Sequence, residues 1–289
     1  MKIQPARRGF LTGAAALIVA GGARATRSDD DAPFRAIEAR TGGRLGVAVR
    51  DTASGRHFAW RGDERFAMCS TFKFLAVAMV LERAAAGATD LDRAIAYGRA
   101  DLLDYAPVTA KHVKAGAMSL RDLCAAAIEW SDNTAANLIL KQIGGPAGLT
   151  RWLRGHGDTV TRLDRTEPTL NTAIAGDPRD TTTPIAMLAD MARILVSEKS
   201  AAFAAPLLIW MRECRTADSK LRAGLPRDWR AGNKTGSGRN GTANDIAILW
   251  PPGRAPLLVA AYLTGAKADA AARDAALADA GRVVAARFG

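Results

Sequence analysis

Ser70 and Lys73 are the residues of this chain whose types and spacing are best suited to chemistry. They stand in the segment Cys69-Ser70-Thr71-Phe72-Lys73, where a polar stretch changes into an apolar helical pattern. Residues three apart on a helix lie on the same face, so the serine hydroxyl and the lysine amine can meet. A hydroxyl becomes a nucleophile when a neighbouring base takes its proton, and a lysine with a lowered pKa can be that base. A helix-capping serine beside a solvated lysine gives the same pattern, so the pair alone does not establish a site.

A second polar cluster, Ser131-Asp132-Asn133, stands between two predicted helices. The Ser131 hydroxyl could relay a proton, and the Asn133 amide could hold a substrate carbonyl. The alternative interpretation is a cap-and-turn cluster, since these residue types are common in loops.

A third motif, Lys234-Thr235-Gly236, lies on a predicted strand and is followed by Ser237. The lysine and the hydroxyl groups could bind an anionic group, and Gly236 would let a substrate backbone approach closely. The alternative is an edge strand that a lysine protects from further pairing.

The fourth element is a long polar loop over residues 158–180. Structureless loops of that length are usually functional. In it, Glu167 and Asn171 could orient one water molecule between them. Arg165 could close the loop by pairing with Asp164 or with Asp180. The alternative is a solvated charged loop.

The predicted secondary structure places these motifs on two helices, a strand and a loop. The apolar pattern over residues 70–86 predicts a helix that is buried on all sides. It puts Ser70 in the first turn, where unpaired N–H groups favour a developing negative charge. Further helices are predicted over 34–40, 119–130, 134–143, 147–155, 183–196, 205–211 and 269–288, and strands over 44–49, 56–60, 229–237, 245–250 and 257–263.

The order of these elements is a hairpin, a helical block, three strands and a final helix, which predicts an α/β (α+β) fold. The simplest packing is one antiparallel β-sheet flanked by helices and built from both chain ends, with an inserted all-helical domain. The predicted boundaries are 1–25 for a signal peptide, 26–61 and 213–289 for the α/β domain, and 62–212 for the all-helical domain.

Composition and spacing argue against a nucleic-acid partner and against a metal site. The 289 residues carry a net charge of +11, of which four positive charges lie in residues 1–25. The remaining arginines are mixed with acidic residues and form no basic stripe interleaved with aromatic side chains. The three cysteines and three histidines do not stand at metal-ligand spacing.

The N-terminus has the pattern of an export signal. A basic start with Arg7-Arg8 is followed by an apolar run over residues 11–20 and by Ala23-x-Ala25, which fits a signal-peptidase site. The arginine pair followed by Phe10 and Leu11 favours the twin-arginine route over a general secretory signal. The run is too short to span a membrane, and no cysteine near the cleavage site supports a lipid anchor. We expect a periplasmic protein without a membrane anchor.

The four motifs, in this order and in these settings, resemble those of the class A β-lactamases. The resemblance covers nearly the whole mature chain, including the segments Arg61 to Phe66 and Asp180 to Pro184 and the dipeptide Pro251-Pro252 after a strand. It implies a β-lactamase/transpeptidase-like fold. It also implies hydrolysis of penicillins and cephalosporins through a covalent acyl-serine, which confers antibiotic resistance. A monomer without a cofactor is expected.

The resemblance also implies roles for individual residues. The implied catalytic group consists of the nucleophile Ser70, Lys73 and Ser131 in proton transfer, and Glu167, which activates the hydrolytic water. Substrate binding is implied for Tyr105, Asn133, Asn171, Lys234, Thr235, Gly236 and Ser237, with the backbone N–H groups of Ser70 and Ser237 as the oxyanion hole. Which residue is the base during acylation stays open between Lys73 and Glu167. Relatives with the Glu167–Pro168 dipeptide have this bond in the cis form.

Some positions depart from the family pattern. Lys220 stands where an arginine is usual, and a lysine cannot make the bidentate contact with a carboxylate. Carboxylate affinity and the response to clavulanate-type inhibitors are therefore left open. Gly238 stands where some carbapenem-hydrolysing relatives have the disulfide partner of Cys69, so we expect no disulfide there and infer no carbapenemase activity. Likewise Val77 replaces the partner that some relatives provide for Cys124.

Two rival interpretations share part of the pattern. A D,D-peptidase has Ser-x-x-Lys and Lys-Thr-Gly but lacks the Glu167 and Asn171 loop, so penicillin would acylate it without turnover. A β-lactam sensor domain also acylates without turnover, and it normally follows membrane helices. The substrate spectrum is not predicted by the sequence.

Overall fold

The computed structural model describes residues 31–289. The predicted signal peptide at 1–25, with its arginine pair, lies outside the described residues.

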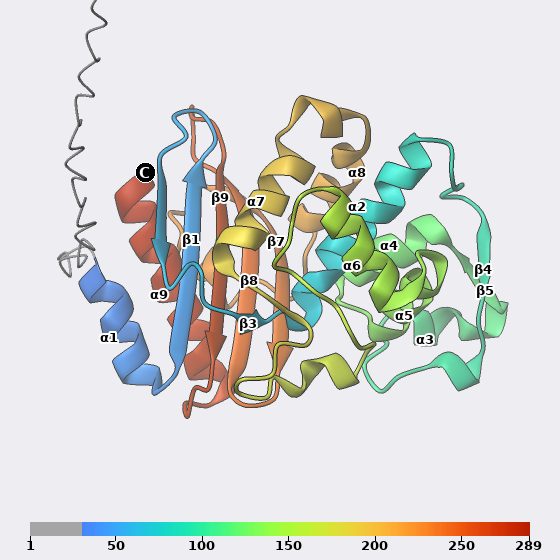
Figure 1. Cartoon of the computed structure of the whole chain (residues 1–289), viewed down its shortest axis with the longest axis horizontal. Helices are drawn as coiled ribbons and strands as arrows, with labels where there is room; N and C mark the ends of the chain where they lie inside the picture. The colour runs from blue at the N-terminus through green and yellow to red at the C-terminus, as the bar shows by residue number, and fades with distance from the viewer. Residues whose placement is uncertain (1–30) are drawn as a thin grey trace, which may run out of the picture.

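A five-stranded antiparallel sheet forms one half of the molecule, and its strand order is β2-β1-β9-β8-β7 (Figure 1). Strands from both chain ends build it, since β1 pairs with β9 from Arg44↔Thr264 to Asp51↔Leu257. The predicted hairpin and the three late strands are therefore confirmed. The strands are β1 Arg44–Asp51, β2 His57–Trp60, β3 Phe66–Ala67, β4 Ala94–Ala96, β5 Ala117–Ser119, β6 Thr181–Thr182, β7 Arg230–Gly238, β8 Thr242–Trp250 and β9 Leu257–Thr264.

Helices cover both faces of this sheet. One face carries α1 and α9, and the other faces α7, α8 and the helical half (Figure 1). Because β8 and β9 are covered on both sides, they are almost continuously buried instead of alternating. The helices are α1 Ala32–Thr41, α2 Phe72–Ala85, α3 Thr109–His112, α4 Leu120–Glu129, α5 Asn133–Gln142, α6 Gly145–Gly155, α7 Pro184–Leu195, α8 Ala201–Arg212 and α9 Ala270–Phe288.

Helix α2 runs through the centre of the helical half. Every residue from Phe72 to Leu81 is buried, including Lys73, as the all-round apolar pattern predicted. Helices α4, α5, α6 and α8 pack around it. The helix is thus a rigid support for whatever stands at its N-terminus.

Three predictions of local structure need correction. Ser70 is not in the first α-helical turn, because a 3₁₀ turn over Cys69–Thr71 precedes α2. The segment 62–212 is not purely helical, since β3 pairs with β6 and β4 pairs with β5 inside it. Helix α8 starts four residues earlier than predicted and contains Pro206, which lies at the sixth helical position instead of at the start. The domain boundaries stay a prediction.

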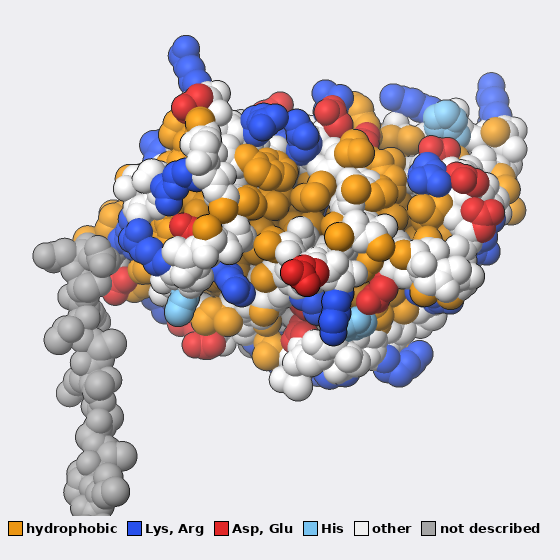
Figure 2. Space-filling view, turned by 90° about the horizontal axis from the view of Figure 1, so that it is seen from above, with side chains coloured by type: hydrophobic (Ala, Val, Ile, Leu, Met, Phe, Trp, Pro, Cys, Tyr) orange, Lys and Arg blue, Asp and Glu red, His pale blue; other side chains and the backbone are white. Residues whose placement is uncertain are grey.

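The surface charges are mixed. On the face shown in Figure 2, basic and acidic side chains are interspersed and form no continuous basic stripe. Between residues 31 and 289, no single helix has the length and apolar character of a membrane span; the bent pair α7 and α8 reaches that length and composition only when taken together.

Candidate active site

The 3₁₀ turn before α2 presents Ser70 at the wall of a cleft. Cys69 has a φ of 45°, a left-handed conformation that non-glycine residues adopt at a cost of about 1–3 kcal/mol. The surrounding buried structure holds this strain, and the Ser70 hydroxyl donates a hydrogen bond to Oε1 of Glu167 at 3.2 Å. Ser70 is 8% exposed, so it is reachable from the cleft while its support is fixed.

Lys73 joins three of the four motifs. Its amine lies 3.0 Å from Oε1 of Glu167, and it donates to the backbone oxygen of Ser131 at 2.8 Å and to Oδ1 of Asn133 at 2.6 Å. Burial lowers the pKa of this amine, and the Glu167 charge opposes that shift. Ser70 and Lys73 therefore lie close together as predicted, and both side chains contact the same atom, Oε1 of Glu167.

Ser131 lies on the loop between α4 and α5, with a φ of 58°. Its neighbour Asp132 is fully buried and fixes the loop: the carboxylate caps α5 through the N–H of Ala135 and accepts the N–H groups of Val108 and Thr109. The cap-and-turn alternative for this motif is correct for Asp132. It leaves the Ser131 hydroxyl free to bind the amine of Lys234 at 2.9 Å.

Lys234 is buried on β7, beside the nucleophile turn. Burial, followed by the nearby charge of Lys73, lowers the pKa of its amine to about 7. Strand β7 is indeed at an edge of the sheet, but a lysine that protects an edge would be solvated, and this one is enclosed. Position 236 also has no room for a larger residue, since a Cβ there would lie 2.8 Å from the backbone oxygen of Met68.

The loop positions Glu167 with two asparagines. Asn137 accepts the Glu167 N–H at 3.0 Å and donates to the Glu167 backbone oxygen at 2.9 Å, and the Glu167–Pro168 bond is cis. Asn171 donates to Oε2 of Glu167, while its own Oδ1 is buried without a hydrogen-bond partner among the described residues. Sequence reasoning missed Asn137; its position one helical turn after Asn133 was the available signal.

Asp180 closes the base of this loop. It is fully buried, accepts the N–H groups of Asp164 and Arg165, and pairs with the Arg165 guanidinium. Asp164 pairs instead with Arg162. Of the two partners that the sequence allowed for Arg165, the structure has Asp180.

These side chains surround a cleft of about 400 Å³. Tyr105 borders it, is 46% exposed, and donates its hydroxyl to the Trp130 backbone oxygen at 3.1 Å. Predicted residues that are too enclosed to line the cleft, such as Lys73 and Lys234, support it from behind. The lining residues are Ser70, Tyr105, Ser131, Asn133, Asn171, Thr216, Lys220, Thr235, Gly236, Ser237 and Asp274.

Asp274 and Thr216 are the lining residues that sequence reasoning missed. Asp274 forms an ion pair with Lys220 and accepts the Ser219 hydroxyl at 2.6 Å, whereas Thr216 shares a hydrogen bond with Thr235. Lys220, expected to meet a substrate carboxylate, is therefore already partly neutralised. Asp274 stands 54 residues further along the chain, on α9, so no sequence pattern linked it to the cleft.

All three cysteines are free and buried. A Cβ on Gly238 would lie 2.6 Å from the sulfur of Cys69, so position 238 is adjacent to Cys69 as the resemblance implied. Burial raises the pKa of the Cys69 thiol, which makes it an inert neighbour of the nucleophile.

Comparisons with known proteins agree with this geometry. Residues 31–288 match the model of the Beta-lactamase enzyme family. Beta-lactamase CTX-M-8 of Citrobacter amalonaticus is 46% identical over 261 residues, covering 90% of this chain and 89% of the relative. Beta-lactamase AST-1 of Nocardia asteroides is 48% identical over 258 residues, covering 88% and 82%. An ancestral (GNCA) class A β-lactamase structure has 56% identity and a TM-score of 0.88, and covers 90% of this chain and 100% of that one. The chain therefore belongs to the class A β-lactamase family.

Proposed function

We propose that this protein hydrolyses β-lactams in two steps, acylation of Ser70 and release of the acyl group by a water molecule at Glu167. The observation that carries the proposal is the position of the Glu167 carboxylate. Its Oε1 accepts the Ser70 hydroxyl at 3.2 Å, and its Oε2 accepts the Asn171 amide. One carboxylate is thus within reach of the nucleophile and of a place for water.

In the first step, Ser70 Oγ attacks the lactam carbonyl carbon and loses its proton. Glu167 accepts this proton along the existing hydrogen bond, and the buried Lys73 amine stands 3.0 Å from the same oxygen as a second acceptor. The N–H groups of Ser70 and Ser237 stabilise the negative charge on the carbonyl oxygen. The carbon–nitrogen bond then breaks, and Ser131, bound to Lys234, gives its hydroxyl proton to the lactam nitrogen. Ser131 regains a proton from Glu167 through the Lys73 amine, which lies 3.5 Å from Ser131 Oγ and 3.0 Å from Oε1 of Glu167, so Glu167 is again a carboxylate.

In the second step, water attacks the ester carbonyl of acyl-Ser70. Glu167 takes a proton from this water, and the unpartnered Oδ1 of Asn171 accepts its other hydrogen. The bond between the carbonyl carbon and Ser70 Oγ breaks, and this oxygen takes back the proton that Glu167 received from the water. The product leaves as a carboxylic acid with an opened ring.

The remaining residues of the cleft form two ends, each of which binds a different part of the substrate. Thr235, Ser237 and Lys220 line the end that attracts the substrate carboxylate, and the buried Lys234 lies behind them. Asn133 and Tyr105 form the end that receives the acyl side chain.

Nitrocefin hydrolysis and intact mass together test this proposal. The purified mature chain should turn over nitrocefin steadily. Glu167→Ala should retain acylation through Lys73 and accumulate an acyl-Ser70 adduct, since a general base contributes about 10²–10⁴-fold to a rate. Ser70→Ala is the matched control and should give no adduct. A stable adduct on the unmutated chain without turnover would establish the peptidase or sensor interpretation instead.

We also propose that the chain is exported to the periplasm by the twin-arginine route. The support is the sequence pattern of Arg7-Arg8 before an apolar run and Ala23-x-Ala25. Replacing both arginines by lysine keeps the charge and should abolish periplasmic β-lactamase activity. Unchanged periplasmic activity of that variant would reject the route.

We propose in addition that the mature protein acts as a monomer. The residues that the mechanism uses all occur within the four motifs of one sequence, so the reaction needs no residue from a second copy. Light scattering of the purified protein should give the mass of one chain, and a dimer mass that persists on dilution would contradict this.

A further inference from the structure

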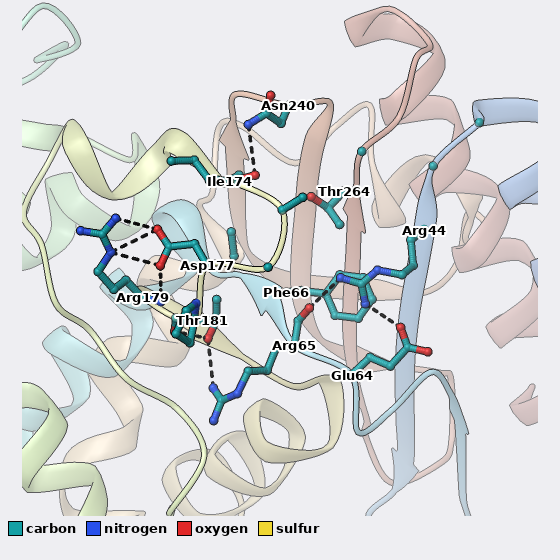
Figure 3. A pocket seen from close by; sticks show the side chains of 18 residues that line it. Arg44, Glu64, Arg65, Phe66, Ile174, Asp177, Arg179, Thr181, Asn240 and Thr264 are labelled. Carbon is teal, nitrogen blue, oxygen red and sulfur yellow. Dashed lines mark hydrogen bonds and ion pairs between the residues drawn. The ribbon is translucent and has the colours of Figure 1, made fainter.

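A second cavity lies against the part of the Glu167 loop that follows Asn171 (Figure 3). Its volume is about 730 Å³, compared with about 400 Å³ for the catalytic cleft, and no residue lines both. Loop residues from Ala173 to Arg179 form one wall, and the ends of β1 and β9 with Arg44 and Thr264 form the facing wall. The volume is that of a small-molecule site.

The charges around this cavity leave one cation without a carboxylate. Arg44 pairs with Glu64 and Arg179 pairs with Asp177, whereas Arg65 has no acidic partner within residues 31–289. Only its Nη1 is engaged, donating to the Val160 backbone oxygen and to the Thr181 hydroxyl, each at 3.0 Å. The Nε and Nη2 edge of the guanidinium, which matches a carboxylate bidentately, is unused by the protein.

Most of the other lining residues have apolar or small side chains. Ile174 lines the cavity and is 52% exposed, so its side chain is available to a ligand. Four glycines in the lining, Gly42, Gly43, Gly176 and Gly265, place bare backbone there. Figure 3 shows Ile174 and Thr264 at one end of the space and the Arg65 guanidinium at the other.

We propose that this cavity binds a small organic anion, an alkyl or aryl carboxylate whose head pairs with Arg65 and whose apolar body packs against Ile174. Both features are required of the ligand. The unpaired guanidinium selects a carboxylate, and the exposed aliphatic wall selects an apolar body.

Occupancy of this site acts on the loop that holds Glu167. Arg65 bridges the two ends of the loop, because Val160 lies near its start and Thr181 follows its end. Asn240, which also lines the cavity, donates to the backbone oxygens of Thr172 and Ala173 at 2.9 and 3.2 Å. A bound anion therefore alters the rate of the step that needs Glu167 and Asn171; this consequence rests on the proposed function, whereas the binding does not.

Titration of the mature protein with octanoate, followed by backbone amide NMR shifts, tests the binding. We expect saturable shifts in residues 42–44, 173–179 and 264–265. Arg65→Gln should weaken octanoate binding at least about tenfold, since a charge-assisted bidentate contact is lost. Arg227→Gln removes the same charge from an exposed site elsewhere and should leave the affinity unchanged. Ile174→Glu, at an exposed position, should also weaken binding and guards against a folding defect in the first variant.

Any of three results would contradict the proposed site. These are octanoate-induced NMR shifts confined to the cleft around Ser70 and Ser237, an affinity for octanol equal to that for octanoate, or unchanged octanoate affinity in both cavity variants. A change in nitrocefin kcat that saturates with octanoate and disappears in Arg65→Gln is expected for the coupling. If saturable binding occurs without any such change, the ligand site stands and the coupling to deacylation is rejected. Absence of nitrocefin turnover altogether would reject the proposed function without affecting the binding result.

Discussion

The nucleophile side of the cleft and the Glu167 side are supported by different kinds of interaction. Ser70 and Lys73 stand at the start of a helix that is buried on every side. Glu167 stands on a loop that Leu163 and Leu170 anchor in the core, and that is otherwise held by polar contacts from Asn137, Arg165–Asp180 and Asn240. Packing of a core helix is distributed over many contacts, whereas each of these polar loop contacts is a single hydrogen-bonded group.

This difference implies that the two chemical steps have different sensitivity to mutation. In the proposed mechanism, acylation depends mainly on the packed side, where Lys73 can replace Glu167 as proton acceptor. Deacylation in that mechanism has no substitute for the Glu167 and Asn171 pair. Changes to loop contacts should therefore slow deacylation more than acylation, and the following predictions use that difference, beginning with the largest effect.

Asn137→Leu should give the largest separation of the two steps. It removes both hydrogen bonds to the Glu167 backbone and leaves these groups without their partner. Misplacement of a catalytic group by about 1 Å can cost about 100-fold, so we expect deacylation to fall about 10–100-fold. Intact mass during benzylpenicillin turnover should show accumulated acyl-enzyme. Gln142→Leu, on the same helix, is the control, and equal accumulation in both variants would contradict the role of Asn137.

Asp274→Asn should change binding and neither chemical step. Without its ion pair, the Lys220 ammonium attracts the substrate carboxylate more strongly, so KM for benzylpenicillin should fall about 2–10-fold at constant kcat. The effect should shrink as salt is added. Asp228→Asn is an exposed control with the same charge change. A raised KM in Asp274→Asn would mean that the pair is needed to orient Lys220.

Asp190→Asn should have the smallest effect, visible in stability. Burial and the charge of Asp158, near the start of the loop, raise the pKa of the Asp190 carboxyl to about 7. Between about pH 4 and 7 the folded chain therefore keeps a proton that the unfolded chain releases, so stability falls as pH rises. The variant lacks this loss, and its stability advantage should grow by about 2–3 kcal/mol between pH 5 and 8 in urea unfolding. A pH-independent difference would contradict the shifted pKa.

The sequence predicted those parts of the site that depend on local pattern. The four motifs stood out through residue type and spacing, and the buried helix and the sheet strands followed from periodicity. The closure of the loop by Arg165 was predicted with two possible partners, and the buried one, Asp180, is correct.

Other parts depend on contacts that no local pattern contains. Asp274 reaches Lys220 from α9, and Asn137 meets Glu167 across 30 residues. The 3₁₀ turn that holds Ser70 begins at Cys69, which adopts a left-handed conformation that its residue type does not favour. The cavity around Arg65 arises from the packing of a loop against two strand ends and was not foreseen.

The separation of the two steps is tested most directly by stopped-flow measurement of acylation and deacylation in Asp180→Asn. This variant keeps the size of the side chain but removes the charge that pairs with Arg165 at the base of the loop. We predict that deacylation falls at least about tenfold more than acylation, because the nucleophile side is left intact. An equal fall in both rates would show that the two sides of the cleft act as one unit and would contradict the account.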